Sequence, residues 1–162
     1  MWSDLLISKK TGVAPSKDGV SLQFDHMMSR LELEITNENA YTFTYVRVKE
    51  SYLTANIDWD NLSVSVNTTG GRKNITARKL SDNNYAVHIV PQPAALVIEI
   101  PVSGTQYGDQ TLTFNLESKT YQSGFKYKAL IKLTVDPPRD ETPVSIIGPI
   151  NPWKEGGEVG QQ

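Results

Sequence analysis

Residues 20–35, which read VSLQFDHMMSRLELEI, decide the class of fold. Apolar residues alternate with polar ones in both halves of this stretch, at Val20, Leu22, Phe24, Leu31, Leu33 and Ile35. A period of two is that of a β-strand buried on one face, whereas a helix would need apolar residues three and four apart. We therefore expect two short strands in tandem, separated at residues 26–29. Phe24 and Leu31 are expected in the core.

The same alternation recurs along the rest of the chain. Further segments that show it are 62–66, 85–89, 96–102, 112–116 and 125–135. Stretches rich in turn-forming residues separate these segments, and Thr69–Gly71 is expected to be a hairpin turn. Short strands at a spacing of about 8–12 residues are typical of a sandwich or a barrel. A sandwich is favoured because Pro101 and the lysine-lined segment 125–135 resemble protected sheet edges.

Length and composition limit the domain organisation and the partners. With 162 residues the chain is expected to form one domain that buries about 70% of its unfolded surface. We expect a leading strand and loop from an interdomain linker at 1–19, the β-sandwich at 20–153 and a flexible tail at 154–162. The net charge of −2 and dispersed basic residues exclude a nucleic-acid surface, and the chain has no cysteine. No apolar run is long enough to span a membrane.

No catalytic or metal-binding constellation is recognisable. The two histidines, His26 and His88, lie far apart in strand-like sequence, and no cysteine or spaced acidic residue completes a metal site. Ser29 and Ser123 lack a nucleophile elbow. Gly70-Gly71 precedes two basic residues rather than a helix, which disfavours a phosphate loop. We therefore expect no enzyme, no cofactor and no metal.

The segment Asp58-Trp59-Asp60 leaves two interpretations open. Two carboxylates are too few for a calcium loop, so a turn with Trp59 packed on the end of the sandwich is favoured. The alternative is a carbohydrate-binding sandwich with aromatic residues as a stacking platform. Its candidate residues are Trp59, Tyr41, Tyr45 and Tyr52. The two hypotheses predict opposite exposure for Trp59, buried in the first and solvent-facing in the second.

Four stretches, in this order, are similar to the fimbrillin family of surface proteins from Gram-negative anaerobes. They contain an F-x-H-x-x-S-R-L phrase, a mid-domain Pro-Gln, an S-G-x-x-Y strand opening and a closing I-x-x-W. The residues that carry the resemblance are Phe24, His26, Ser29, Arg30, Leu31, Pro91, Gln92, Gly124, Tyr127 and Trp153. The resemblance covers nearly the whole chain.

The resemblance implies the C-terminal domain of a pilus subunit. The expected fold is a transthyretin-like β-sandwich of about seven antiparallel strands with Greek-key connections. Expected partners are other fimbrial subunits or surface proteins, bound through strand edges, and host glycans. The protein is expected at the cell surface or outer membrane, held by a lipid anchor N-terminal to this sequence. Because Val159 is the only apolar residue of 154–162, an anchor, accessory or tip role is favoured over a shaft role.

Overall fold

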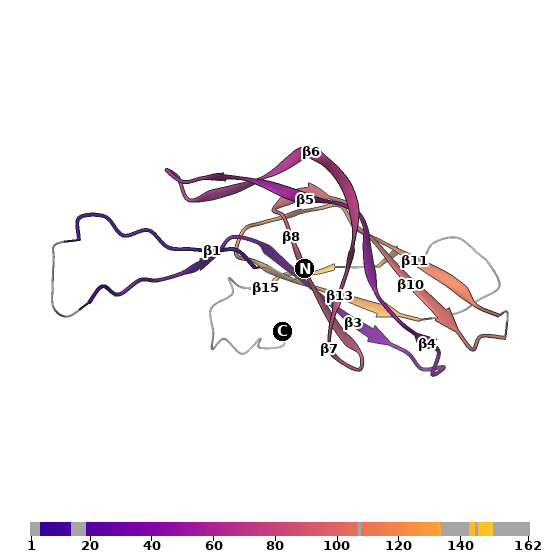
Figure 1. Cartoon of the computed structure of the whole chain (residues 1–162). Coiled ribbons are helices and arrows are strands. Elements are labelled where there is room, and N and C mark those ends of the chain that lie inside the picture. Colours follow the sequence, from indigo (N-terminus) through magenta and orange to yellow (C-terminus); the bar gives the residue numbers. More distant parts are fainter. Residues whose placement is uncertain (1–3, 14–18, 107, 134–142, 145, 151–162) are drawn as a thin grey trace.

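The computed structural model describes residues 4–13, 19–106, 108–133, 143–144 and 146–150. Every regular element within these ranges is a β-strand, as the sequence predicts (Figure 1). Most strands belong to two large sheets, and the remainder form two small ribbons. The all-β prediction is therefore confirmed.

The first sheet has the strand order β14-β11-β10-β5-β6, with β4 also pairing with β10. Its strands are β4 (Thr42–Phe43), β5 (Arg47–Asp58), β6 (Ser63–Thr76), β10 (Val97–Ser103), β11 (Gln110–Leu116) and β14 (Pro143–Val144). The strand β5 is continuous over 12 residues. Its hairpin with β6 is long and bends away from the sandwich (Figure 1).

The second sheet has the order β15-β13-β3-β8-β7. Its strands are β3 (Ser29–Thr36), β7 (Arg78–Ser81), β8 (Asn84–Ile89), β13 (Lys126–Lys132) and β15 (Ile146–Ile150). The two small ribbons pair β1 (Leu6–Ile7) with β2 (Asp25–His26) and β9 (Gln92–Ala94) with β12 (Lys119–Tyr121).

Strand direction differs in part from the expected antiparallel sandwich. The central strand β3 is antiparallel to β8 but parallel to β13, and β14 is parallel to β11. A parallel neighbour cannot be joined by a tight hairpin. Here β13 reaches the free edge of β3 only after the chain has passed through β10 and β11 of the other sheet. The local sequence pattern carries no information about the direction of such a distant pairing.

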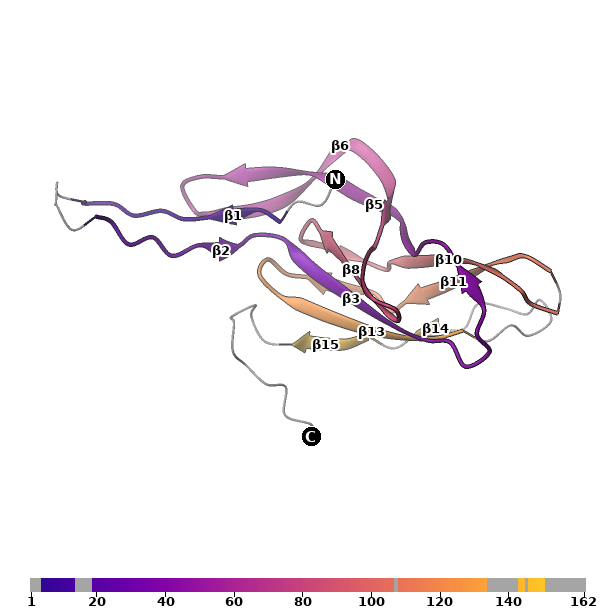
Figure 2. The same ribbon diagram turned by 60° about the horizontal axis from the view of Figure 1, so that its bottom comes forward.

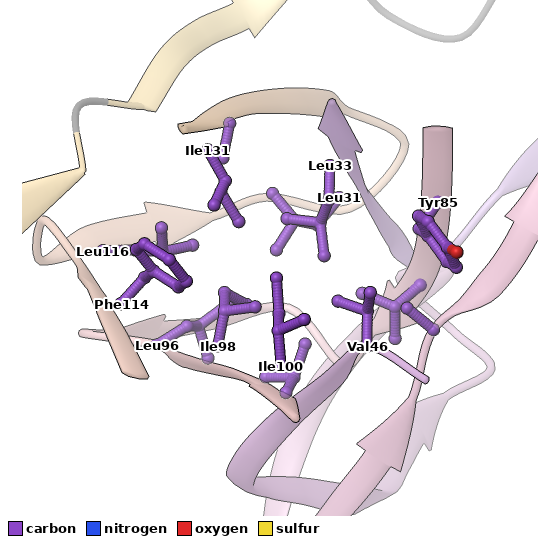
Figure 3. Packing of buried hydrophobic residues seen from close by; sticks show 14 of the residues in the cluster. Leu31, Leu33, Val46, Tyr85, Leu96, Ile98, Ile100, Phe114, Leu116 and Ile131 are labelled. Atoms are coloured by element: carbon purple, nitrogen blue, oxygen red, sulfur yellow. The ribbon is translucent and has the colours of Figure 1, made fainter. Parts of the chain in front are cut away.

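The core lies between the two large sheets (Figure 3). Leu31, Leu33 and Ile35 of β3 are all buried and contribute to the same cluster as Ile98 and Ile100 of β10. Each buried side chain of this size contributes about 1.5–3 kcal/mol. The prediction that the second half of the stretch 20–35 is a one-sided buried strand is thus confirmed.

The outer face of β3 carries charged residues that pair across strands. Glu32 lies 3.7 Å from Lys126, and Glu34 pairs with Lys128 of the parallel strand β13. Arg30 reaches Glu32 on the same strand at 2.8 Å. Lys126 and Lys128 therefore face acidic partners on the neighbouring strand β3, and Lys132 pairs with Glu38 just beyond that strand at 2.8 Å. They do not mark an unpaired edge, because β13 lies between β15 and β3.

The first half of the stretch 20–35 does not form the predicted buried strand. Only Asp25–His26 pairs with another strand, and Val20, Leu22 and Phe24 are 48%, 49% and 58% exposed. This segment leaves the sandwich together with residues 5–13 as a projecting hairpin (Figure 2). Phe24 was predicted to be a core residue, and this is wrong. The alternation is real, but no described element covers its apolar face.

The predicted hairpin turn at residues 69–71 is also wrong. Strand β6 continues through it, with Tyr52 opposite Arg72 and Thr54 opposite Asn67, so residues 68–71 bulge out of the ladder. A Cβ on Gly70 would lie 2.7 Å from the Thr54 hydroxyl, which explains the glycine at this position. Glycine tolerates the dihedral angles of a bulge as readily as those of a turn.

Candidate interaction surface

The base of the projecting hairpin is where two of the four family-like stretches meet. Ser29 is fully buried, and its hydroxyl donates a hydrogen bond to the carbonyl oxygen of Gln122. The backbone N–H of Gly124 donates to the carbonyl of Met28 at 3.0 Å. These contacts hold the start of β3 against the turn between β12 and β13. The motif residues therefore have a structural role at this junction.

Other motif residues lie at separate points of the sandwich. Tyr127 is buried, with its hydroxyl donating to Thr120 O at 3.1 Å, and its ring meets Tyr121 edge-on. Pro91 lies between the end of β8 at Ile89 and the start of β9 at Gln92, and it has no N–H to donate to a ladder. Gln92 is buried next to it. Trp153 lies outside the described residues.

His26 and His88 do not form a metal site with other described residues. His26 pairs with Asp4 at the base of the hairpin, whereas His88 lies on β8 opposite Arg30 of β3. Burial lowers the pKa of His88, an effect that Arg30 and His26 reinforce and Asp4 opposes. Within the described ranges no group of three or more potential metal ligands comes together.

A second, smaller core fixes the base of the projecting hairpin to the β5–β6 hairpin. Ile7 and Met27 of the projecting hairpin pack with Val64 of β6 and with Val90, which follows β8, and all four are buried. Lys9 adds hydrogen bonds from its ammonium group to the carbonyl oxygens of Trp59 at 3.2 Å and Asp60 at 3.3 Å. Figure 2 shows the two hairpins side by side. The base is thereby held in place, although sequence reasoning did not find these long-range contacts.

The turn between β5 and β6 is built on Asp58. Its carboxylate accepts hydrogen bonds from the N–H groups of Asp60 at 2.9 Å and Asn61 at 3.1 Å, and from the Asn61 side-chain amide at 2.8 Å. These bonds, led by the one from the Asn61 side chain, lower the pKa of Asp58. The turn was predicted correctly. Its carboxylate serves the turn itself rather than a cation.

Trp59 at this turn is 63% exposed, so the prediction that it packs on the sandwich is wrong. Its exposure is the outcome expected for a sugar platform, but the other members of that platform are elsewhere. Tyr52 lies seven residues away along β5, a distance of about 20 Å at the rise of a strand. The ring of Tyr45 is covered by the guanidinium of Arg47, which lies 4.2 Å from its centre, and Tyr41 packs on the main core. The structure does not bring the four aromatic residues onto one face.

We call residues 5–13 and 19–26 the arm. The arm presents a series of large apolar side chains to solvent, at Leu6, Val13, Val20, Leu22 and Phe24. Isolated exposed apolar residues are common, but a row of them on one projecting element indicates a contact surface. The arm is therefore the candidate functional site.

The fold defines the class of protein as a β-sandwich module with a projecting arm whose apolar side chains are exposed. The described part of the chain holds no helix of the length and apolarity needed to cross a membrane. The chain belongs to the fimbrillin-like family, whose model matches residues 1–153. The family resemblance inferred from the four stretches is thus confirmed.

Two solved structures share the fold. A protein assigned to cell adhesion from Bacteroides uniformis is 18% identical, with a TM-score of 0.63 over 83% of this chain and 54% of that chain. Another from Bacteroides ovatus is 16% identical, with a TM-score of 0.56 over 85% of this chain and 49% of that chain. This chain thus spans about half the length of these structures. Among curated proteins, none matches it.

Proposed function

We propose that this protein is a non-enzymatic cell-surface module of adhesion or pilus assembly, which binds a partner protein through its arm. The observation that carries the proposal is the row of exposed apolar side chains at Val20, Leu22 and Phe24 on an element whose base is fixed. Membership of the fimbrillin-like family supports it, as does the shared fold with two structures assigned to cell adhesion.

Covering the exposed apolar side chains of the arm would contribute to the free energy of binding a partner, but it would not by itself offset the cost of association. Val20, Leu22 and Phe24 are only about half exposed, so covering them yields about half the free energy of a full burial, roughly 0.8–1.5 kcal/mol each. Association costs an estimated 4–15 kcal/mol in lost translational and rotational freedom. A partner is therefore expected to extend beyond these side chains and to contact the neighbouring Trp59 turn, which Lys9 of the arm joins by hydrogen bonds.

The finer assignments belong to the same proposal. They are a transthyretin-like Greek-key sandwich at residues 20–153, export to the outer membrane with a lipid anchor N-terminal to this sequence, and an anchor, accessory or tip role in a pilus. The strand edges of β6 and β7 offer additional backbone groups for fimbrial subunits.

The test compares adhesion by cells that express the wild-type protein with cells that express the Leu22→Asp/Phe24→Asp variant in its place. Loss of two apolar contacts of roughly 0.8–1.5 kcal/mol each is expected to reduce partner binding by about tenfold or more. The matched control is Leu130→Asp, because Leu130 is 46% exposed on the outer face of β13, away from the arm.

Antibody labelling of intact cells provides a second readout for all three proteins. Equal surface labelling with loss of adhesion only in the arm variant supports the proposal. Adhesion by the arm variant at the wild-type level would refute the role of the arm. Labelling only after the cells are permeabilised would refute the surface location.

A further inference from the structure

A hollow of about 350 Å³ lies where the β5–β6 hairpin passes the β9–β12 ribbon. Its polar lining comes from both sides, at Glu50, Ser51, Tyr52, Arg72, Gln92 and Ser118. We call it the bulge pocket. It is separate from the arm and from the Trp59 turn, and nothing in the proposed function uses it. Its volume is at the small end of ligand pockets, which are about 300–1,000 Å³.

The backbone around the bulge pocket departs twice from regular strand pairing. One irregularity lies between Val48 and Ser51 and the other between Tyr52 and Thr54. Glu50 lies within the first irregularity and has a φ of +49°, a left-handed conformation held by a hydrogen bond from its N–H to Asn74 Oδ1 at 3.1 Å. Bulges and left-handed residues occur preferentially at binding sites, because they redirect side chains out of the sheet.

The floor of the pocket contains two buried polar side chains. Ser51 is 2% exposed and Gln92 is 6% exposed. The Gln92 amide nitrogen donates to Ser51 Oγ at 3.4 Å and to Val90 O at 3.1 Å. Each of the two side chains has a hydrogen-bond partner, and the Gln92 amide oxygen can accept and the Ser51 hydroxyl can donate one further hydrogen bond to a ligand. Burying two polar groups is costly unless they are satisfied.

The charged groups of the bulge pocket, Arg72 and Glu50, lie at its rim. The Arg72 guanidinium lies over the Tyr52 ring at 5.1 Å from its centre, which orients the planar group at the mouth of the pocket. Glu50 provides carboxylate oxygens on the neighbouring strand. A guanidinium binds a carboxylate through two parallel hydrogen bonds, whereas a carboxylate accepts hydrogen bonds from hydroxyl groups. Leu96 and Ala94 add an apolar wall.

We propose that the bulge pocket binds a single-ring sugar acid of the hexuronate class. The sugar carboxylate pairs with Arg72, its hydroxyl groups bond to Glu50, Ser51 and Gln92, and the C–H face of its ring packs on Leu96. This site shares only Tyr52 with the aromatic platform that the sequence suggested. It lies on a different part of the molecule from the arm, so the two proposals can fail independently.

The test is a titration of the ¹⁵N-labelled protein with sodium glucuronate, followed by two-dimensional NMR. We expect saturable shifts confined to the backbone amides of residues 50–52, 72 and 92–96. Arg72→Gln is expected to weaken binding by about tenfold or more, because it removes a charge-assisted pair. The matched control, Arg78→Gln on the exposed strand β7, is expected to bind like the wild type. Glu50→Gln provides a second variant and is expected to weaken binding severalfold.

Glucose and acetate serve as comparison probes. Weaker binding of both than of glucuronate supports the proposal, since the pocket must recognise the carboxylate and the hydroxyl groups together. Equal affinity for acetate would overturn it in favour of a simple anion site. A dispersed spectrum of the folded protein without saturable shifts would also overturn it, as would unchanged affinity in both Arg72→Gln and Glu50→Gln.

Discussion

Replacing Gly124 by alanine tests whether the junction between the start of β3 and the β12–β13 turn is tightly packed. Gly124 has a φ of +74°, and a Cβ added there would lie 3.0 Å from the carbonyl oxygen of His26. The left-handed conformation costs a non-glycine residue about 1–2 kcal/mol. Relieving the contact requires a backbone shift that we expect to add about 1 kcal/mol. Gly124→Ala should therefore lower the free energy of unfolding by about 2–3 kcal/mol, and the melting temperature by about 4–12 °C.

Gly104→Ala is the matched control for this prediction. Gly104 has a φ of +78°, but no atom lies within 4 Å of its added Cβ. Its substitution should cost only the conformational part, about 1–2 kcal/mol. Urea denaturation of both variants, followed by circular dichroism, measures the difference. Equal destabilisation of the two variants would show that the backbone near His26 moves aside at no cost in free energy. The claim that the junction is tightly packed would then be refuted.

Further predictions concern buried polar groups. Tyr127→Phe should cost about 0.5–1.5 kcal/mol, because it removes the hydroxyl that donates to Thr120 O and accepts from the N–H of Gln122. Tyr121→Phe should be neutral or slightly stabilising in the same denaturation assay, because the Tyr121 hydroxyl is buried without a hydrogen-bond partner in the described structure. Because burial lowers the pKa of His88, folding favours its neutral form. Stability should therefore be complete above the unfolded pKa of about 6.5 and fall as the pH drops below it. Thermal melts between pH 5 and 8 should show a weaker pH dependence for His88→Gln, and identical profiles would contradict the prediction.

The comparison of two halves of one stretch shows what a sequence pattern can predict. Both Leu31–Ile35 and Val20–Phe24 alternate, and only the first is buried. The alternation of apolar and polar residues indicates only that one face of the strand is apolar, which depends on the local residues alone. Whether a second layer covers that face depends on contacts with residues far along the chain.

The same limit explains the errors at Gly70 and Trp59. Glycine permits both a turn and a bulge, and the choice depends on the pairing of β5 with β6. The Asp58 turn follows from local side-chain hydrogen bonds and was predictable, but the exposure of Trp59 was not. An aromatic residue at a turn packs inward only if the hairpin lies on the body of the protein.

The sequence by itself determined the all-β class, the buried face of β3 and the membership of the fimbrillin-like family. These properties are encoded in local alternation and in short motifs, which do not require knowledge of distant contacts. The tertiary structure alone decided the parallel pairing of β3 with β13, the uncovered face of the arm and the bulge pocket. The bulge pocket combines residues from 50 to 118, and such a site exists only after strands distant in sequence have been brought together.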